Sequence, residues 1–368
     1  MGEDPFRNVR FAPCSCERAA DVTPRRRILS GLVGMGLAAG LSACRSASPV
    51  PGHEHGAIDV HHHHIPPFYL EQYRDKVAGV RGGGLSQAWL SWTPEKAIDA
   101  MDAAGVATAV LSLTSPGVWF GDVEAARRTA RQVNDYAAEL GAKHRGRFGL
   151  FGVLPLPDQE GSLKEIEHAL DVLKADGIGL MTSYGDKWLG NPAYDTVFEE
   201  LNRRKAVVFV HPTAPLCCRS LMPDVAPMIA EVPQDTARAI TNMLFTGTFS
   251  RYRDIRFIFT HAGGTMPMMV GRMKQYGPSN LASLAPHGVE QELARHCFDL
   301  AGTANRPAFA ALTSFVPVSQ ILLGSDNPFV PLAETVRDLH SVGLPDSAVR
   351  AITRDNAQAL LPTLRRYG

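Results

Sequence analysis

The chain has 368 residues, of which 45% are hydrophobic and 20% are charged, an ordinary composition for a globular protein. Lys and Arg total 37, and Asp and Glu total 37, so the formal net charge at pH 7 is zero. A balanced charge excludes the broad electrostatic field that draws a protein to nucleic acid or to an acidic membrane surface. We therefore expect a small-molecule partner and no nucleic acid.

The first 43 residues read as an export signal. Arg25, Arg26 and Arg27 precede an apolar run of 16 residues, from Ile28 to Ala43, which is short for a membrane-spanning helix but typical of a signal peptide. The paired arginines resemble a twin-arginine signal. The run ends in LSAC, which resembles a lipobox, so we expect Cys44 to carry a lipid anchor and residues 44–56 to form a tether. The protein would then be periplasmic or membrane-anchored; a cytoplasmic protein with an uncleaved leader is the alternative.

The cysteines outside this leader do not predict a disulfide framework. They are Cys217, Cys218 and Cys297. A bridge between the neighbours Cys217 and Cys218 would distort the peptide between them, so we expect free thiols at all three positions.

From residue 57 onward, short apolar or β-branched runs alternate with longer helical patterns. One such helix is expected after Thr93, a residue suited to capping, with Pro94 at its first position. Repeated strand and helix units of this kind predict a parallel sheet, and residues 57–368 are long enough for a barrel, which needs about 250 residues. We predict an α/β fold, a distorted (β/α)8 TIM barrel. Its eight strands are expected in AIDVH (57–61), ATAVLSL (107–113), RFGLFGVLPL (147–156), GIGLMTS (from Gly177), AVVFVHP (206–212), RFIFTHAGG (256–264), CFDLAGT (297–303) and ILLGSDNPF (321–329).

Polar side chains gather where several of these strands end. The carboxyl ends of barrel strands form the face that carries catalysis, so the residues at these positions are candidates for a shared site. They are Asp59, His61 and His63 at the end of the first strand, His211 at the end of the fifth, His261 at the end of the sixth and Asp326 at the end of the eighth.

The four consecutive histidines at the end of the first strand, His61 to His64, do not by themselves identify a ligand pair. Side chains alternate along a strand, so His61 and His63 would share one side, about 6.5 to 7 Å apart, while His62 and His64 would share the other. Periodicity leaves both pairs open.

A family resemblance selects one pair. The segment DVHHHHIP resembles the D-x-H-x-H-x-x-P opening of the amidohydrolase-related (amidohydrolase 2) metal-dependent family, in its decarboxylase branch, which contains aminocarboxymuconate-semialdehyde, methylsalicylate and resorcylate decarboxylases. Asp59 and Pro66 set the register, which makes His61 and His63 the pair. VFVHP, THAGG and LGSDNPF are similar to the motifs of the fifth, sixth and eighth strands, and the resemblance extends over about residues 57–360.

The resemblance implies one divalent metal ion, zinc or alternatively manganese, held by His61, His63, His211 and Asp326. Imidazole and carboxylate groups suit such an ion. Hydrolytic relatives with two metals carry a lysine on the fourth strand; GIGLMTS has none, so we expect a single ion. His261 is expected to transfer a proton together with Asp326.

The resemblance also implies a reaction. THAGG, GRMKQYG and GSDNPF together favour a non-oxidative decarboxylase of an aromatic or unsaturated, salicylate-like carboxylic acid. Trp119 and Phe120 are candidates to pack the substrate ring, and Arg272 to neutralise its carboxylate or to bridge the subunits of a homodimer, the expected assembly. The alternatives are a mononuclear metal-dependent hydrolase of a lactone, ester or amide, and a barrel that only binds a ligand.

Overall fold

The computed structural model describes residues 56–81, 87–218, 221–222 and 224–367. All of them belong to one compact unit, Pro49–Gly368. The predicted signal, the lipid attachment at Cys44 and the tether up to residue 55 lie outside the described residues.

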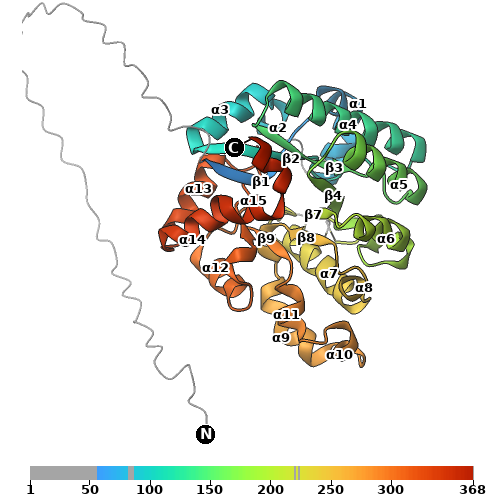
Figure 1. The fold of residues 1–368 in the computed structure, drawn as a ribbon. Coiled ribbons are helices and arrows are strands. Elements are labelled where there is room, and N and C mark those ends of the chain that lie inside the picture. Colours follow the sequence, from blue (N-terminus) through green and yellow to red (C-terminus); the bar gives the residue numbers. More distant parts are fainter. Residues whose placement is uncertain (1–55, 82–86, 219–220, 223, 368) are drawn as a thin grey trace, which may run out of the picture. The chain divides into compact units, whose positions relative to one another are not determined.

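Eight parallel strands form a single sheet that curls into a barrel (Figure 1). The last strand meets the first through hydrogen bonds, because the amide of Val60 donates to the carbonyl of Leu323 at 3.0 Å and the amide of Asp326 donates to the carbonyl of His61 at 2.8 Å. The eight predicted strands and the (β/α)8 barrel are thus confirmed. In sheet order the strands are β1 (Ala57–His63), β2 (Val106–Ser112), β3 (Phe148–Val153), β4 (Gly177–Met181), β7 (Val207–His211), β8 (Arg256–Phe259), β9 (Cys297–Asp299) and β10 (Ile321–Leu322).

Several strands end earlier than the apolar runs suggested. β8 stops at Phe259 and gives way to a 3-10 turn, His261–Gly263, and β10 has only two residues. The reason is the backbone beyond them: His261 has φ 54° and Asp326 has φ 65°, values in the left-handed region that no strand contains. His261 therefore lies on a sharp bend just beyond β8, and Asp326 lies on another in the segment that follows β10.

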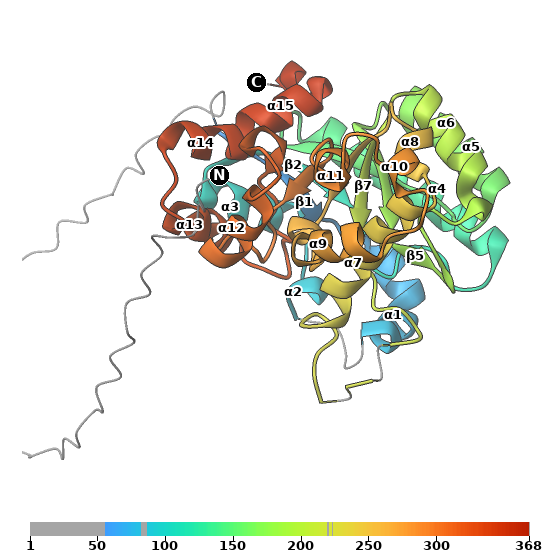
Figure 2. The same ribbon diagram turned by 90° about the horizontal axis from the view of Figure 1, so that it is seen from below.

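Helices surround the barrel (Figures 1 and 2). The capped helix begins as predicted: Thr93 Oγ1 accepts from the amide of Lys96 at 3.2 Å and Pro94 occupies the first turn. Within the described ranges, no helix is both long enough and apolar enough to cross a membrane. The helices are α1 (Pro67–Arg81), α2 (Gln87–Leu90), α3 (Pro94–Ala104), α4 (Val123–Lys143), α5 (Gln159–Glu167), α6 (Asp195–Arg203), α7 (Glu231–Phe245), α8 (Thr248–Arg251), α9 (Met266–Tyr276), α10 (Leu281–Leu284), α11 (Val289–Leu293), α12 (Arg306–Thr313), α13 (Leu332–Ser341), α14 (Asp346–Arg350) and α15 (Asn356–Leu360); a small hairpin, β5 (Ser183–Tyr184) and β6 (Lys187–Trp188), follows β4.

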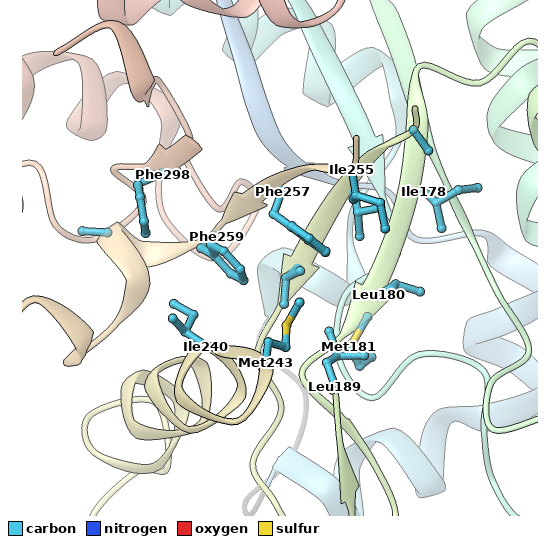
Figure 3. Packing of buried hydrophobic residues seen from close by; sticks show 14 of the residues in the cluster. Ile178, Leu180, Met181, Leu189, Ile240, Met243, Ile255, Phe257, Phe259 and Phe298 are labelled. Atoms are coloured by element: carbon cyan, nitrogen blue, oxygen red, sulfur yellow. The ribbon is translucent and has the colours of Figure 1, made fainter. Parts of the chain in front are cut away.

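The main core lies between the strands and the helices that cover them. Figure 3 shows Ile178 and Leu180 of β4 and Phe257 of β8 together with Ile240 and Met243 of α7, all of them members of one buried cluster. Burial of such side chains is the main force that stabilises a barrel, and it keeps the strand ends in a constant arrangement.

One histidine in this core has no polar partner. His296 is 2% exposed, its ring lies 4.4 Å from that of Phe249 and 5.3 Å from that of Phe257, and neither ring nitrogen has a hydrogen-bond partner in the described part of the chain. Burial lowers the pKa of His296 to about 3. The imidazole is therefore a neutral, unsatisfied group inside an aromatic cluster.

We expect His296→Leu to make the protein less sensitive to acid. An unfolded chain binds a proton at His296 below about pH 6.5, whereas the folded chain does so only near pH 3, so this histidine removes stability as the pH falls between these values. Between pH 7.5 and pH 5 the loss is on the order of 2 kcal/mol. Denaturant titrations at both pH values measure it, and the exposed His287→Leu serves as the control. An equal pH dependence in both variants would contradict the explanation.

Candidate metal and catalytic centre

Four side chains meet at the carboxyl ends of three strands. They are His61 and His63 of β1, His211 at the end of β7 and Asp326 beyond β10, and each offers a nitrogen or oxygen that lies within 4.8 Å of the others. All four residues are buried. The structure thus brings together the four residues that the family motifs had singled out.

The other two histidines of the run point away from this cluster. His62 Nδ1 lies 3.0 Å from Asp59 Oδ2, and the His64 ring stacks on Tyr136 of α4 with centroids 6.3 Å apart. The alternation of side chains along β1 explains the division. Of the two pairs that periodicity left open, only His61 and His63 face the cluster.

The hydrogen bonds of the three imidazoles leave the same ring nitrogen available. Nδ1 of His61 lies 2.9 Å from Oδ2 of Asp299. Nδ1 of His63 lies 3.2 Å from the carbonyl oxygen of Ser112, and Nδ1 of His211 lies 2.9 Å from that of Pro212. A carbonyl or carboxylate accepts a hydrogen bond there, so Nδ1 is the donor in each ring and Nε2 is the nitrogen available to a ligand. Three such nitrogens and one carboxylate are a donor set that fits a divalent metal ion.

The electrostatics of the cluster agree with this donor set. Burial lowers the pKa of His63 to about 4 and the pKa of His211 well below its ordinary value, so both rings are neutral. Burial also disfavours charge on His61, but Asp299 and Asp326 outweigh it and raise its pKa to about 10. Burial opposes ionisation of Asp326, yet the adjacent His61 and His63 hold the pKa of that carboxyl well below its usual range. A cation that binds through His61 Nε2 must therefore displace a proton.

His261 lies beside the cluster rather than in it. Its ring centroid is 5.0 Å from that of His61 and 6.1 Å from that of His211. Nδ1 lies 2.9 Å from the carbonyl of Ala301, while Nε2 is buried and has no hydrogen-bond partner among the residues described. A histidine with one nitrogen anchored and the other unengaged is suited to hold or release a proton.

The three predicted substrate contacts pack against other side chains of the chain. Phe120 stacks on Tyr73 of α1 at 4.6 Å, and Trp119 is partly buried against the hydrophobic core. Arg272 is exposed on α9, where its guanidinium lies 4.9 Å from the ring centre of Tyr276. The structure assigns packing contacts to these residues, and their contact with a substrate stays a prediction.

Two residues that lie near the cluster were not predicted from the sequence as part of the site. The ring of Phe329 lies 5.7 Å from that of His63, so an aromatic side chain next to the cluster comes from the segment after β10. Asp299, the last residue of β9, contacts His61. The rule that located the other polar residues at strand ends applies to Asp299 too and could have found it.

The expectation of free thiols at Cys217 and Cys218 was wrong. The two neighbours are joined by a disulfide in the segment that follows β7. A turn accommodates the bridge, since the amide of Cys218 donates to the carbonyl of Pro215 at 3.0 Å. Cys297 is a free, buried thiol, as expected.

Comparisons with known proteins agree with the geometry. A family model for amidohydrolases matches residues 58–363. The decarboxylase yanB of Aspergillus niger is 36% identical over 324 residues, which cover 83% of this chain and 87% of that protein. The 6-methylsalicylic acid decarboxylase acuB of Aspergillus aculeatus is 33% identical over 325 residues, with 84% and 97% coverage. The crystal structure of 5-carboxyvanillate decarboxylase from Novosphingobium aromaticivorans, complexed with manganese, superposes with a TM-score of 0.77 at 21% identity and covers 84% of this chain and 97% of that one. The chain belongs to the amidohydrolase family, in the branch that contains the aromatic-acid decarboxylases.

Proposed function

We propose that this protein is a metal-dependent, non-oxidative decarboxylase of a salicylate-like aromatic acid, and that it works as a homodimer. The observation that carries the proposal is the buried set of three imidazoles and one carboxylate with the unengaged Nε2 of His261 beside it. Similarity to a 6-methylsalicylic acid decarboxylase over 84% of the chain supports the choice of reaction.

The proposed cofactor is one divalent ion, zinc or manganese, with His61, His63, His211 and Asp326 as its ligands. When bound, the ion supplies Lewis-acid binding of the substrate's carboxylate and of the oxygen next to it. Manganese is present in the solved 5-carboxyvanillate decarboxylase. A single ion agrees with β4, which offers no lysine; Lys187 is exposed in the hairpin beyond it.

The chain's own residues would then move a proton. Nδ1 of His261 donates to the carbonyl of Ala301 and keeps its own proton, so the proton delivered to the substrate would be a second one, carried on Nε2. The proton is added to the ring carbon that carries the carboxylate, the bond between these two carbons breaks, and its electron pair remains with the ring as CO2 leaves. Asp326, which is close to both β1 histidines, holds the position of the reacting group. No oxidant or reductant is required.

A substrate panel separates a lyase from a hydrolase. We expect CO2 release from 2-hydroxybenzoates such as 6-methylsalicylate or 2,6-dihydroxybenzoate, at least about 100-fold faster than from 4-hydroxybenzoate, because only an ortho hydroxyl can share the cation with the carboxylate and such a positioning contact is worth a few kcal/mol. CO2 release is followed with the manganese-loaded protein, and a chelator-treated sample is the control. Hydrolysis of lactones or esters without CO2 release from any acid would contradict the proposal.

We also propose that the protein is exported as a lipoprotein. The support is the sequence of the leader, with its arginines before an apolar run that ends in LSAC. Replacing Arg25, Arg26 and Arg27 with lysine is expected to keep the protein in the cytoplasm, because the export route reads the arginines themselves. Cell fractionation measures this, and Cys44→Ala, which removes only the lipid attachment, is the control. Unchanged export of the lysine variant would exclude the twin-arginine route.

A further inference from the structure

A single buried carboxylate contacts both parts of the proposed catalytic centre. Asp299 ends β9 and is 0% exposed. Its Oδ2 lies 2.9 Å from Nδ1 of His61. Its Oδ1 accepts from the backbone amide of His261 at 3.0 Å and from that of Ala301 at 3.0 Å.

The contact with His61 determines which nitrogen of that ring faces the cluster. A carboxylate can only accept, so Nδ1 is the nitrogen that donates to Asp299 and Nε2 is the nitrogen turned toward the cluster. That Nε2 lies 3.1 Å from His63 Nε2 and 3.4 Å from Asp326 Oδ1. Gly324 leaves room for the pair, because a Cβ at this position would lie 2.7 Å from the Cβ of Asp299 and 2.8 Å from that of His61.

The contacts with His261 hold its main chain and, indirectly, its ring. The backbone of His261 has φ 54°, which is unfavourable for a residue with a side chain. The backbone amide of His261 donates to Asp299, and its Nδ1 donates to the carbonyl of Ala301. The amide of Ala301 in turn donates to the same carboxylate of Asp299. The position of His261 therefore depends on the same carboxylate as the orientation of His61.

We propose that Asp299 is a positioning residue that sets His61 for cation binding and His261 for proton transfer at the same time. The inference rests on the proposed function only in its second half, since cation binding can be measured without turnover. Removing the carboxylate should weaken both properties together.

Asp299→Asn tests the proposal with almost no change in shape. All three partners of Asp299 are donors, so the amide of asparagine cannot accept a hydrogen bond from every one of them. Its NH2 group, itself a donor, faces either the two backbone amides or Nδ1 of His61. We expect the dissociation constant for Mn²⁺ to rise about 10- to 100-fold, the range seen when such supporting carboxylates are removed. At saturating Mn²⁺, kcat should still fall at least about 10-fold with little change in KM, because an incorrectly placed proton donor loses only transition-state stabilisation.

Two further variants sharpen the experiment. Asp176→Asn is the matched control, because Asp176 also accepts from a backbone amide, that of Leu150 at 2.8 Å, and from the hydroxyl of Thr363, but it precedes β4 at the amino end of the strands. It should leave the Mn²⁺ dissociation constant and kcat unchanged. The double variant Asp299→Asn with His261→Ala should have the same kcat as His261→Ala alone, since Asp299 acts on turnover through His261.

Chelator competition measures Mn²⁺ affinity, and steady-state kinetics measure the rest. A dissociation constant for Asp299→Asn within threefold of the wild-type value overturns the proposal, and an unchanged kcat at saturating Mn²⁺ overturns its second half. A wild-type protein without decarboxylase activity, but with Mn²⁺ affinity that depends on Asp299, refutes the proposed function and supports the first half. If Asp299→Asn does not fold, the crystal structure of the manganese-loaded wild type decides: Nε2 of His61 on the ion with Nδ1 within about 3 Å of Asp299 supports the proposal, and Nδ1 on the ion overturns it.

Discussion

Asp326→Asn is expected to remove both the cation and the activity. Asp326 is the carboxylate of the four-residue cluster, and its Oδ1 lies 3.0 Å from Nε2 of His63. The amide has nearly the same shape but no charge, so the remaining imidazoles would hold a divalent ion without a compensating anion. We expect the metal content to fall from about one equivalent to below ~0.1 and kcat to fall by at least about 10³-fold, because both the ion and the reacting geometry are lost. Elemental analysis after dialysis and an assay of CO2 release measure the two effects.

His211→Ala should have the same consequence, since it removes an imidazole that reaches the cluster from the opposite side of the barrel, on β7. The matched control is His64→Phe, which replaces a histidine of the same run whose ring stacks on Tyr136. It should retain full metal content and activity. Full occupancy in both Asp326→Asn and His211→Ala would show that the assigned ligand set is wrong.

His261→Ala is expected to separate metal binding from catalysis. The ring lies next to the cluster, but its Nδ1 donates to the carbonyl of Ala301 and its Nε2 has no hydrogen-bond partner among the described residues. Removing it should leave about one equivalent of metal in place and lower kcat by about 10²- to 10⁴-fold, the range for losing a positioned proton donor. Metal analysis and steady-state kinetics on the same sample make the comparison.

A second substitution at this position controls for the backbone. Asn tolerates the left-handed conformation of residue 261 better than most residues do, so His261→Asn keeps the turn and removes only the imidazole. Both variants should lose activity to a similar extent. Activity of His261→Ala within a few-fold of the wild-type value, or loss of the metal from His261→Asn, would contradict a role in proton transfer.

The four residues of the cluster could be found from the sequence because each of them belongs to a short motif at the end of a strand. His61 and His63 have the alternation of a strand, and His211 and Asp326 follow apolar runs in VFVHP and LGSDNPF. Strand ends of a parallel barrel meet at one face whatever the separation along the chain. For these residues a local pattern and a general rule of topology were sufficient.

The surroundings of the loop aromatics, of the paired cysteines and of Arg272 could not be predicted from local sequence patterns. Trp119 and Phe120 stood in a loop, and whether a loop aromatic faces a substrate or packs on a helix depends on the path of the chain; Phe120 packs on Tyr73. The disulfide between Cys217 and Cys218 lies in a turn in which the amide of Cys218 donates to the carbonyl of Pro215. Arg272 is exposed beside Tyr276 on α9, a position that helical periodicity alone does not define.

The sequence by itself determined the barrel, the family and the face on which polar residues gather, because hydrophobic runs and short motifs are local properties of a chain. Only the tertiary structure decided how these residues support one another. Asp299 and His61 are separated by 238 residues and Asp299 and His261 by 38, so their contacts exist only once the barrel has closed. The bends at His261 and Asp326 likewise adopt left-handed backbone angles, a conformation that side chains disfavour and that the surrounding hydrogen bonds hold in place.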